Sequence, residues 1–256
     1  MKRLSVIVIT RNEARNIAPC LESVAFADEV VVVDWASTDD TVALARAKGA
    51  TVVVTEDWPG FGPQKNRALQ QATGEWVFSI DADERVTPEL REAILAAMAN
   101  PRFDAYEINR RSSYCGQYMR HSGWSPDWVV RLVRRGRGRF SDSLVHERFL
   151  PDGPAGRLGG LLLHESMPDF ESVIDKLDRY STAGAQALMA KGVKGSLGKS
   201  LGHGLWAFLR TYVFRLGFLD GRLGLALAIS NAEGTYYRYM KLWLMQRRAA
   251  TSPGTR

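Results

Sequence analysis

Four short apolar runs, separated by segments of helical length, occupy the first eighty residues of this 256-residue chain. The runs are Leu4–Thr10, Glu29–Asp34, Thr51–Thr55 and Glu75–Ile80. Short apolar runs bounded by polar residues are typical of buried strands. Strands that alternate with helices favour right-handed βαβ units, so this part of the chain predicts a parallel sheet flanked by helices.

The segments between these strands carry helix signals. Helices are expected over about residues 16–26, 38–48 and 62–73. Gly49 and Gly74 close the last two, as suits the preference for glycine after a helix C-terminus. A further helix is predicted to begin with Thr87 as its N-cap and Pro88 at its first position.

The pattern changes after about residue 103. Further strands are expected over residues 103–110, 129–133 and 160–164. Residues 151–157 are expected to form a loop because they are rich in proline and glycine. A polar amphipathic helix is predicted over about 171–191, an apolar and aromatic helical segment follows up to about residue 244, and the tail at 249–256 is expected to fray.

The composition is that of a globular protein, with 45% hydrophobic and 24% charged residues. A net charge of +6 indicates attraction to an anionic partner, such as nucleotide phosphates, nucleic acid or an acidic membrane surface. No recognised nucleic-acid-binding module occurs in the sequence, so nucleic acid is not an expected partner.

The N-terminal run and the cysteines bear on the cellular compartment. Cys20 and Cys115 are too few for a disulfide framework or a four-cysteine zinc site, which indicates reduced thiols in a cytosolic protein. The first apolar run is interrupted at once by Arg11, Asn12 and Glu13, which favours a first strand over a signal peptide. No stretch reaches the ~20 uninterrupted apolar residues of a membrane span.

Two acids, Asp81 and Asp83, follow the fourth apolar run. Residues two apart on an extended backbone point the same way, so both carboxylates can reach one site. Their oxygens suit Mg²⁺ or Mn²⁺. A solvated acidic turn is the alternative, but the position at the carboxyl end of a buried strand favours a binding site.

Polar residues also follow the first two apolar runs, over Thr10–Glu13 and Asp34–Asp40. The carboxyl ends of parallel strands meet at one sheet edge, so a composite site is expected there. Ser37 or Thr38 as a helix N-cap is the structural alternative. Asp34 lies before that cap, and its carboxylate can accept a hydrogen bond from a nucleobase or a ribose hydroxyl. Because neither a Gly-x-Gly-x-x-Gly nor a Gly-Lys-Ser/Thr loop occurs, dinucleotide enzymes and P-loop NTPases are disfavoured.

The order of these motifs resembles family 2 glycosyltransferases of the GT-A fold. The motifs are Ser-Val-Ile-Val-Ile-Thr-Arg-Asn-Glu from Ser5, Val-Val-Asp-x-x-Ser-Thr-Asp-Asp-Thr from Val32, Phe-Gly-x-Gln-Lys-Asn-x-Ala-Leu from Phe61, and Asp-Ala-Asp-Glu from Asp81. Later motifs are similar to the lipopolysaccharide core β-1,4-glucosyltransferase branch. They include His-Ser-Gly-Trp from His121 and Val-His-Glu from Val145. One departure is Trp35-Ala36, where the family usually has small residues; Trp35 is interpreted first as a packing residue, with base stacking and donor selection as alternatives.

The resemblance implies an α/β fold, with a Rossmann-like, mostly parallel sheet flanked by helices and a C-terminal helical extension. It implies a GT-A catalytic domain over residues 1–165, with the nucleotide-sugar half at about 1–100 and the acceptor half at about 101–165. A helical, basic and aromatic extension over 166–248 follows it.

The resemblance also assigns roles to matching positions. Residues expected to bind the nucleotide-sugar donor are Thr10, Asn12, Glu13, Asp34, Gln64, Lys65, Asn66, Asp81 and Asp83. Asp83, with Asp81 beside it, would hold Mg²⁺ or Mn²⁺. Glu147 would be the catalytic base, and its structural alternative is a surface salt bridge to Arg148 or Arg131.

A wall for the acceptor is expected from Trp124, Asp127 and Arg131, because aromatic faces suit sugars and guanidinium groups suit phosphates or carboxylates. His146 is also expected near the acceptor, and a packed or hydrogen-bonded histidine is the alternative. For Arg137 and Arg139 a solvated face is preferred.

The basic and aromatic segment from Leu201 to Trp243 is typical of interfacial membrane binding, and packing against the catalytic domain or another subunit is the alternative. The resemblance implies an inverting transferase that moves glucose from UDP-glucose to a heptose of the lipopolysaccharide inner core. It would act at the cytoplasmic face of the inner membrane as a peripheral protein with a glycolipid acceptor. The alternatives are a transferase acting on polyprenyl-phosphate or capsule intermediates, and a catalytically silent binding protein of the same fold.

Overall fold

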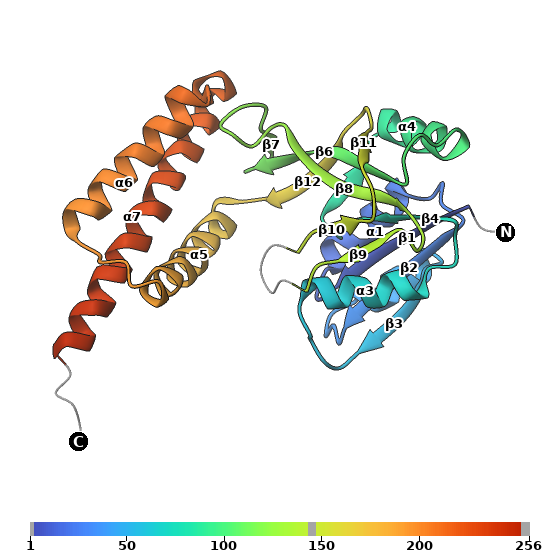
Figure 1. The fold of residues 1–256 in the computed structure, drawn as a ribbon, viewed down its shortest axis with the longest axis horizontal. Helices are drawn as coiled ribbons and strands as arrows, with labels where there is room; N and C mark the ends of the chain where they lie inside the picture. The colour runs from blue at the N-terminus through green and yellow to red at the C-terminus, as the bar shows by residue number, and fades with distance from the viewer. Residues whose placement is uncertain (1–2, 143–146, 252–256) are drawn as a thin grey trace. The chain divides into compact units, whose positions relative to one another are not determined.

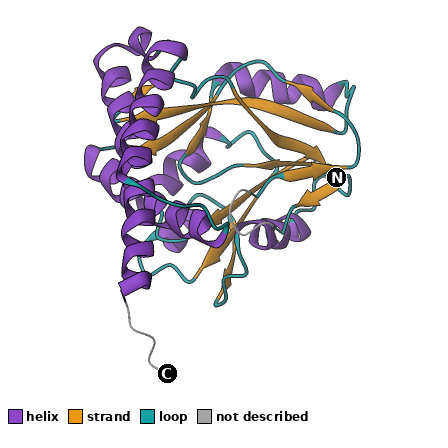
Figure 2. Cartoon of the chain, turned by 60° about the vertical axis from the view of Figure 1, so that its left-hand side comes forward, coloured by secondary structure: helices purple, strands orange, loops and turns teal. Residues whose placement is uncertain are grey.

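The computed structural model describes residues 3–142 and 147–251. The chain divides into two compact units, one made of Met1–Arg111 and Pro126–His164, the other of Ser112–Ser125 and Glu165–Arg256. Sheet and helices alternate in the first unit, whereas the second is mainly helical (Figures 1 and 2).

The first unit begins with four parallel strands in the order β3-β2-β1-β4. These strands are β1 (Leu4–Thr10), β2 (Glu29–Trp35), β3 (Thr51–Thr55) and β4 (Trp76–Ser79). The helices that connect them are α1 (Ala14–Ser23), α2 (Thr41–Ala47) and α3 (Phe61–Gln71). The βαβ pattern predicted from the sequence is therefore confirmed.

The sheet continues past β4 in the order β8-β6-β12-β5, and β8 runs antiparallel to both β4 and β6. These strands are β5 (Glu84–Val86), β6 (Ala105–Tyr114), β8 (Asp127–Arg134) and β12 (Leu162–Met167). Beside them lie α4 (Pro88–Ala99), β7 (Gln117–Tyr118), β9 (Gly138–Phe140), β10 (Phe149–Pro151) and β11 (Ala155–Arg157). The predicted α4 cap is confirmed, since Thr87 Oγ1 accepts a hydrogen bond from Leu90 N at 3.3 Å.

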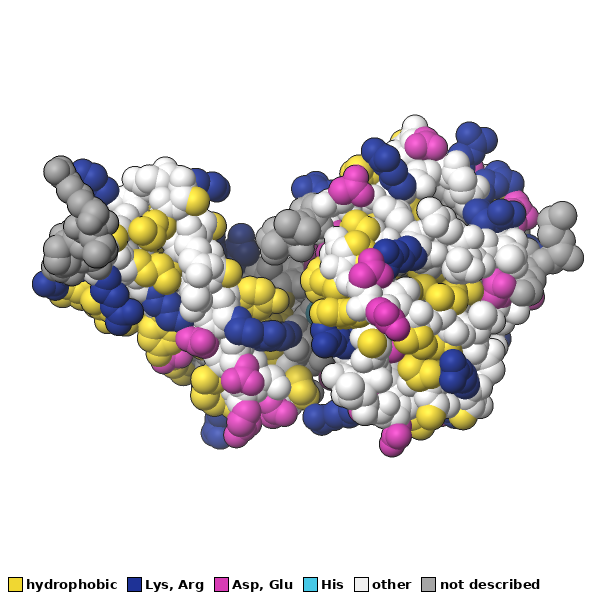
Figure 3. Space-filling view, turned by 90° about the horizontal axis from the view of Figure 1, so that it is seen from below, with side chains coloured by type: hydrophobic (Ala, Val, Ile, Leu, Met, Phe, Trp, Pro, Cys, Tyr) yellow, Lys and Arg dark blue, Asp and Glu magenta, His cyan; other side chains and the backbone are white. Residues whose placement is uncertain are grey.

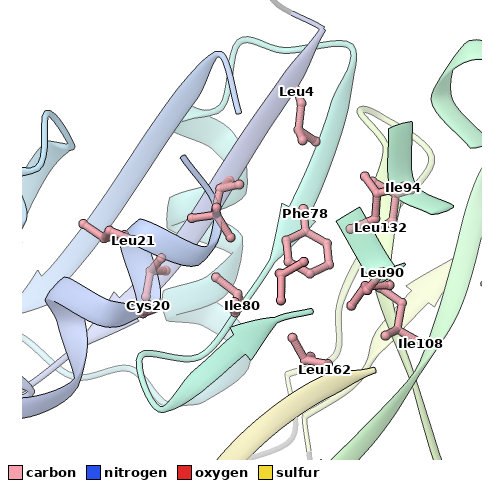
Figure 4. Close-up of a cluster of buried hydrophobic side chains, with 14 of the residues drawn as sticks. Leu4, Cys20, Leu21, Phe78, Ile80, Leu90, Ile94, Ile108, Leu132 and Leu162 are labelled. Atoms are coloured by element: carbon pink, nitrogen blue, oxygen red, sulfur yellow. The ribbon is translucent and has the colours of Figure 1, made fainter. Parts of the chain in front are cut away.

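The core covers both faces of the sheet because side chains alternate along each strand. Val6 and Val8 pack on one face with residues of α1, α2 and α4, and Ile7 packs on the other with Ala68 of α3. Figure 4 shows the first of these clusters, in which Phe78 of β4 lies among leucine and isoleucine side chains. Burial on both faces explains why these strands read as continuous apolar runs.

The prediction of a loop over residues 151–157 is wrong in part. Pro151 ends β10, which pairs with β9, and residues 155–157 form β11, which pairs in parallel with β6. Gly156 is needed in β11 because a Cβ there would lie 2.5 Å from the Phe103 ring. Its glycine therefore marks close packing and not a turn.

The second unit contains three long helices, α5 (Phe170–Ala190), α6 (Leu197–Leu209) and α7 (Gly221–Thr251). A π-helical turn (Arg210–Phe214) and a 3₁₀ turn (Gly217–Asp220) join α6 to α7, and these two helices lie side by side (Figure 1). Gly204 of α6 permits this approach, since a Cβ there would lie 3.3 Å from the carbonyl oxygen of Ala232. Among the described helices, none has the length and apolar content that crossing a membrane requires.

Candidate active site

The loops after β1 and β2 are tied together by Asp34, whose side chain is fully buried. Thr10 Oγ1 donates a hydrogen bond to Asp34 Oδ2 at 2.8 Å. The backbone N–H of Ser37 donates to Oδ1 at 2.8 Å, and the Ser37 hydroxyl donates to Oδ2 at 2.5 Å. Asp34 thus shapes the loop from within, and direct contact between its carboxylate and a nucleotide stays a prediction.

Asn12 joins the same two loops from the other side. Its backbone has a positive φ of 54°. Its Oδ1 accepts a hydrogen bond from Thr38 N at 2.8 Å, and its own N–H donates to the Ser37 hydroxyl at 2.8 Å. The predicted capping of the next helix by Ser37 or Thr38 is wrong, because α2 begins only at Thr41 and both residues are used to connect the loops.

An aromatic stack borders these loops. Trp35 lies between the Arg11 guanidinium, 3.4 Å from the ring centroid, and the ring of Trp58, at a centroid distance of 4.9 Å. Phe61 packs edge-on against Trp58. The packing interpretation of Trp35 agrees with these contacts.

Glu13 lies at the start of α1 and is half-buried. Burial raises the pKa of its carboxyl, a hydrogen bond from Asn16 lowers it, and the negative charges of Asp83, Asp39 and Asp81 raise it further. Asp39, Asp81 and Asp83 thus lie close enough to affect Glu13, which agrees with the prediction that acids gather at the carboxyl ends of the parallel strands.

Asp81 lies at the centre of a network of buried charges. Its Oδ1 is 2.9 Å from Lys65 Nζ, and its Oδ2 is 2.6 Å from the Arg131 guanidinium. Burial by itself would raise the pKa of Asp81, but Arg131 and Lys65 outweigh it and hold that pKa well below its usual range. Both oxygens of Asp81 are thereby engaged by cations, which does not suit the metal-ligand role predicted for this residue.

Glu84 completes the network. Its Oε1 lies 2.6 Å from the Arg131 guanidinium, and its Oε2 accepts a hydrogen bond from the backbone N–H of Asp81 at 2.9 Å. Burial raises the pKa of Glu84 in spite of Arg131. Arg131, predicted to bind the acceptor, is itself almost completely buried between the two carboxylates and so positions Asp81.

Glu147 joins this network through Lys65, whose Nζ lies 2.9 Å from Glu147 Oε1. The structural alternative for Glu147, a salt bridge to Arg148 or Arg131, is not the contact observed. Gly62, at the start of α3, allows Ser141 and Glu147 to lie close to this helix. A Cβ at Gly62 would lie 1.8 Å from the carbonyl oxygen of Ser141.

Gln64 and Asn66 flank Lys65 in α3 but make structural contacts. Gln64 is fully buried and donates to the Thr55 hydroxyl at 2.8 Å. Asn66 exchanges two hydrogen bonds with the backbone of Phe140 in β9, at 2.9 and 3.0 Å. Of these three residues, all predicted to bind the nucleotide-sugar donor, Lys65 is the one that lines the pocket described next.

A pocket of about 320 Å³ opens beside Lys65, Asp81 and Glu147. Its other polar and aromatic lining residues are Glu107, Arg110, Trp128, Arg131, Phe140, Arg148 and Phe149. Asp127, predicted near the acceptor, holds the Arg110 guanidinium at 2.8 Å. The pocket therefore places several cations and the indole of Trp128 in the same cavity as Glu147.

Asp83 faces His164, with 3.2 Å between Asp83 Oδ2 and His164 Nε2. Carboxylate oxygen and imidazole nitrogen are both ligands of Mn²⁺ and related metals. The described residues contain no group of three or more His, Cys, Asp or Glu side chains placed to hold a metal ion. Two protein ligands still suit a divalent cation that takes its remaining ligands from water and substrate phosphates.

His164 was missed by the sequence analysis. The signal was present, since the apolar run Leu161–Leu163 ends at this histidine. Two other predicted residues do not belong to the described part of the first unit. Trp124 belongs to the second unit, where it packs edge-on against Tyr114, and His146 lies outside the described residues.

The family model for glycosyl transferase family 2 matches residues 5–149, which hold both the strand-end loops and Glu147. The chain belongs to this family. The resemblance stated from the sequence, the GT-A type of α/β fold and the assignment as an enzyme that transfers sugars are therefore confirmed.

Curated relatives cover most of this family 2 chain. A lipopolysaccharide core biosynthesis glycosyltransferase of Rhizobium meliloti, LpsC, is 34% identical over 93% of the chain and 89% of the relative. An uncharacterised glycosyltransferase of Rickettsia typhi is 32% identical over 94% of the chain and 87% of the relative. The protein is thus a homologue of a lipopolysaccharide core glycosyltransferase.

Solved structures of other glycosyltransferases are more distant. S. aureus TarS 1–349 is 17% identical, with 96% of this chain and 92% of that chain covered and a TM-score of 0.47. Glucosyl-3-phosphoglycerate synthase of Mycobacterium tuberculosis, solved with Mn²⁺, UDP and glucosyl-3-phosphoglycerate, is 27% identical over 45% of each chain, with a TM-score of 0.37.

The depressed pKa of Asp81 predicts a pH-dependent contribution to stability. A carboxyl with a lowered folded-state pKa stabilises the fold above its unfolded pKa of about 3.9, and this contribution is lost as the pH falls toward the folded pKa. We expect Asp81→Asn to lower the free energy of unfolding at pH 7 and this deficit to shrink below about pH 4. Urea denaturation at several pH values measures it.

The matched control for this experiment is Asp104→Asn, which removes an exposed acid paired with Arg134 in the same unit. We expect a small deficit in the free energy of unfolding for this variant, of at most about 1 kcal/mol at any pH. An Asp81→Asn deficit that is equally small at neutral pH would contradict the role assigned to the buried network.

Proposed function

We propose that this protein is an inverting transferase that moves glucose from UDP-glucose to a heptose hydroxyl of the lipopolysaccharide inner core. One observation carries the proposal: Lys65 Nζ lies 2.9 Å from both Asp81 Oδ1 and Glu147 Oε1, so the predicted base belongs to the same cluster as the strand-end acids. A silent protein of the same fold has no need of this arrangement. Similarity to a lipopolysaccharide core glycosyltransferase supports the acceptor class.

Inversion at an anomeric carbon needs one direct displacement and therefore one base. Glu147 lines the pocket and is partly exposed, with 20% of its side chain accessible. Its Oε1 is held by Lys65, and its carboxylate accepts the proton of the acceptor hydroxyl as that oxygen attacks. Lys65 orients the base and places a positive charge beside the departing diphosphate.

Asp83 and His164 would hold Mg²⁺ or Mn²⁺ in this proposal. When bound, the metal neutralises charge on the nucleoside diphosphate leaving group. Thr10, Asn12, Glu13 and Asp34 belong to the hydrogen-bonded strand ends and loops that would surround the nucleotide.

The acceptor would lie in the pocket beside Glu147. Trp128 offers an aromatic face to a sugar, and its ring is covered on one side by the Arg157 guanidinium at 4.6 Å. Arg110 and Arg148, which also line this pocket, suit a phosphate on the saccharide.

We propose that the second unit binds the anionic inner face of the inner membrane. Large apolar side chains are exposed along α6 and the turn after it, including Leu201 (58% exposed), Leu205 (62%) and Phe214 (67%). Leu197, Leu201, Leu205 and Leu209 recur every fourth residue and so share one helix face. Hydrophobic side chains stand beside lysine and arginine on the helical unit in Figure 3, a combination that suits an acidic lipid surface.

The role of Glu147 is tested by Glu147→Gln, which removes the basic carboxylate and keeps the shape of the side chain. We expect turnover to fall by at least ~10²-fold, the effect of losing a positioned base, while UDP-glucose binding is retained. The measurement is steady-state transfer of glucose to a heptose-containing acceptor. Asp142→Asn, an exposed acid of the preceding segment, is the control, and near-normal turnover by Glu147→Gln would show that the base is another group.

The donor and metal sites are tested by calorimetry of UDP-glucose binding with Mn²⁺, with Mg²⁺ and with EDTA. We expect metal-dependent binding by the wild type and its loss in Asp83→Ala and in His164→Ala, because each variant removes one of two protein ligands. Asp104→Asn is the charge-matched control. Binding that is equally tight in EDTA would contradict the metal site and leave the donor assignment standing.

Membrane binding is tested with a triple variant, Leu201→Ser, Leu205→Ser and Phe214→Ser, at three exposed positions. We expect its affinity for vesicles of phosphatidylcholine and phosphatidylglycerol to fall at least about tenfold in sedimentation, because apolar area no longer enters the interface. The control replaces Val54 and Leu150, which are also exposed but lie in the first unit. Equal binding by the triple variant and the control would assign this face to packing against a protein.

A further inference from the structure

The second unit contains a pocket of its own, with a volume of about 370 Å³. It is bounded by α5, α7, the end of α6 with the π-helical turn, and the loop after β7. All of its lining residues belong to the second unit, so the pocket is complete within that unit. This pocket and the pocket beside Glu147 share no lining residue.

The lining of this pocket is positively charged. Lys176, Arg210, Arg215 and Arg238 contribute four cations, and no aspartate or glutamate is among the lining residues. Lys176 Nζ donates a hydrogen bond to the carbonyl oxygen of Ser166 at 2.6 Å, whereas three arginines around one cavity suit an anion.

The three arginines lack a side-chain partner within the part of the chain that the structure describes. Among the described residues, none makes an ion pair or a side-chain hydrogen bond with Arg210, Arg215 or Arg238, and the Nε atom of Arg238 is buried without an acceptor. Lys241, a neighbour on α7, is in contrast held by Asp178 at 2.7 Å and by two hydroxyls. Since none of these three guanidinium groups pairs with a carboxylate of the described residues, each can pair with an anion that enters the pocket.

Glycines position two of these arginines. A Cβ at Gly123, whose φ is +77°, would lie 2.2 Å from a terminal nitrogen of Arg215. A Cβ at Gly184 of α5 would lie 2.6 Å from Arg238 Nε. The absence of a side chain at each glycine leaves room for Arg215 and Arg238 on the pocket wall.

The rest of the lining suits a sugar. Tyr114 and Trp124 pack edge-on at a centroid distance of 6.2 Å, and both border the pocket. Hydroxyl and amide groups also line the pocket, and each makes a hydrogen bond within the unit; they belong to Ser122, Thr211, Ser230, Asn231 and Thr235. Aromatic surface beside hydroxyls and cations is the chemistry that recognises a phosphorylated saccharide.

We propose that this pocket binds the phosphate of a phosphorylated saccharide, with Arg210, Arg215 and Arg238 as the phosphate ligands. Arg210 and Arg215 flank the π-helical turn that exposes Val213 and Phe214, so a phosphate carried by a lipid reaches the pocket from the apolar face. The pocket deepens the proposed function by giving the second unit a phosphate site for a glycolipid, and its role in the reaction rests on that function. Phosphate binding by this pocket can be measured whether or not the proposed transferase reaction is correct.

The test measures binding of glucose 6-phosphate by calorimetry, with glucose as the neutral control. The variants are Arg238→Gln and the pair Arg210→Gln with Arg215→Gln. Arg210 and Arg215 are exposed, so this pair keeps the test valid if Arg238→Gln fails to fold. Arg222→Gln, an exposed arginine of α7 outside the pocket, is the matched control.

We expect saturable binding of glucose 6-phosphate by the wild type and by Arg222→Gln, and an affinity at least about tenfold lower in the pocket variants, since hydrogen bonds to charged groups are lost. If glucose 6-phosphate does not bind saturably, and phosphatidic acid vesicles show no dependence on Arg238 in the experiment below, the proposal is overturned. If the pocket variants still bind glucose 6-phosphate with wild-type affinity, the ligand occupies another site, such as the pocket beside Glu147, and this result would also overturn the proposal.

A second arm identifies the source of the phosphate, with vesicles of phosphatidylcholine containing one tenth phosphatidic acid. If the ligand is a lipid phosphate, Arg238→Gln loses vesicle affinity and Arg222→Gln, with the same change in net charge, does not. Equal losses in both variants would show non-specific attraction and refute a lipid ligand. UDP-glucose binding, measured in parallel, separates failure of this proposal from failure of the donor assignment.

Discussion

The buried pairing of Arg131 with Asp81 and Glu84 is the interaction on which the architecture of the site depends. One guanidinium joins strand β8 to the end of β4 and to β5, and Lys65 extends the same cluster to α3 and Glu147. Arg131 and Glu84 are almost completely buried, and buried charges are costly unless they are paired, so removal of either one leaves an uncompensated charge in the interior. The parts of the site that are distant in sequence are therefore held in one mutual arrangement.

The sequence predicted the first half of the fold well for a physical reason. Strands covered on both faces must be apolar throughout, and the glycines and the Thr87 cap that separate them have strong local preferences. The prediction was poorer where partners were distant: β11 looked like a loop because Gly156 was read as a turn residue, although it makes room for the Phe103 ring. Local preference carries no information about such a neighbour.

The same limit applied within the site. The sequence predicted which residues gather at the carboxyl edge of the sheet, but not which way each side chain turns. Asp34 and Asp81 are occupied by protein partners, whereas Asp83 faces His164. Gln64 and Asn66 lie on either side of Lys65 yet bind the protein, because neighbours on a helix point about 100° apart.

Gly62 has a consequence for how this chain can vary. It carries no functional group, yet any side chain there would collide with the Ser141 carbonyl, and Glu147 Cβ lies only 3.6 Å from the same point. A side chain at this position would displace Ser141 and Glu147, and would thereby affect the proposed base without any contact with substrate. Backbone clearance thus limits substitution near the site even at a position that takes no part in the chemistry.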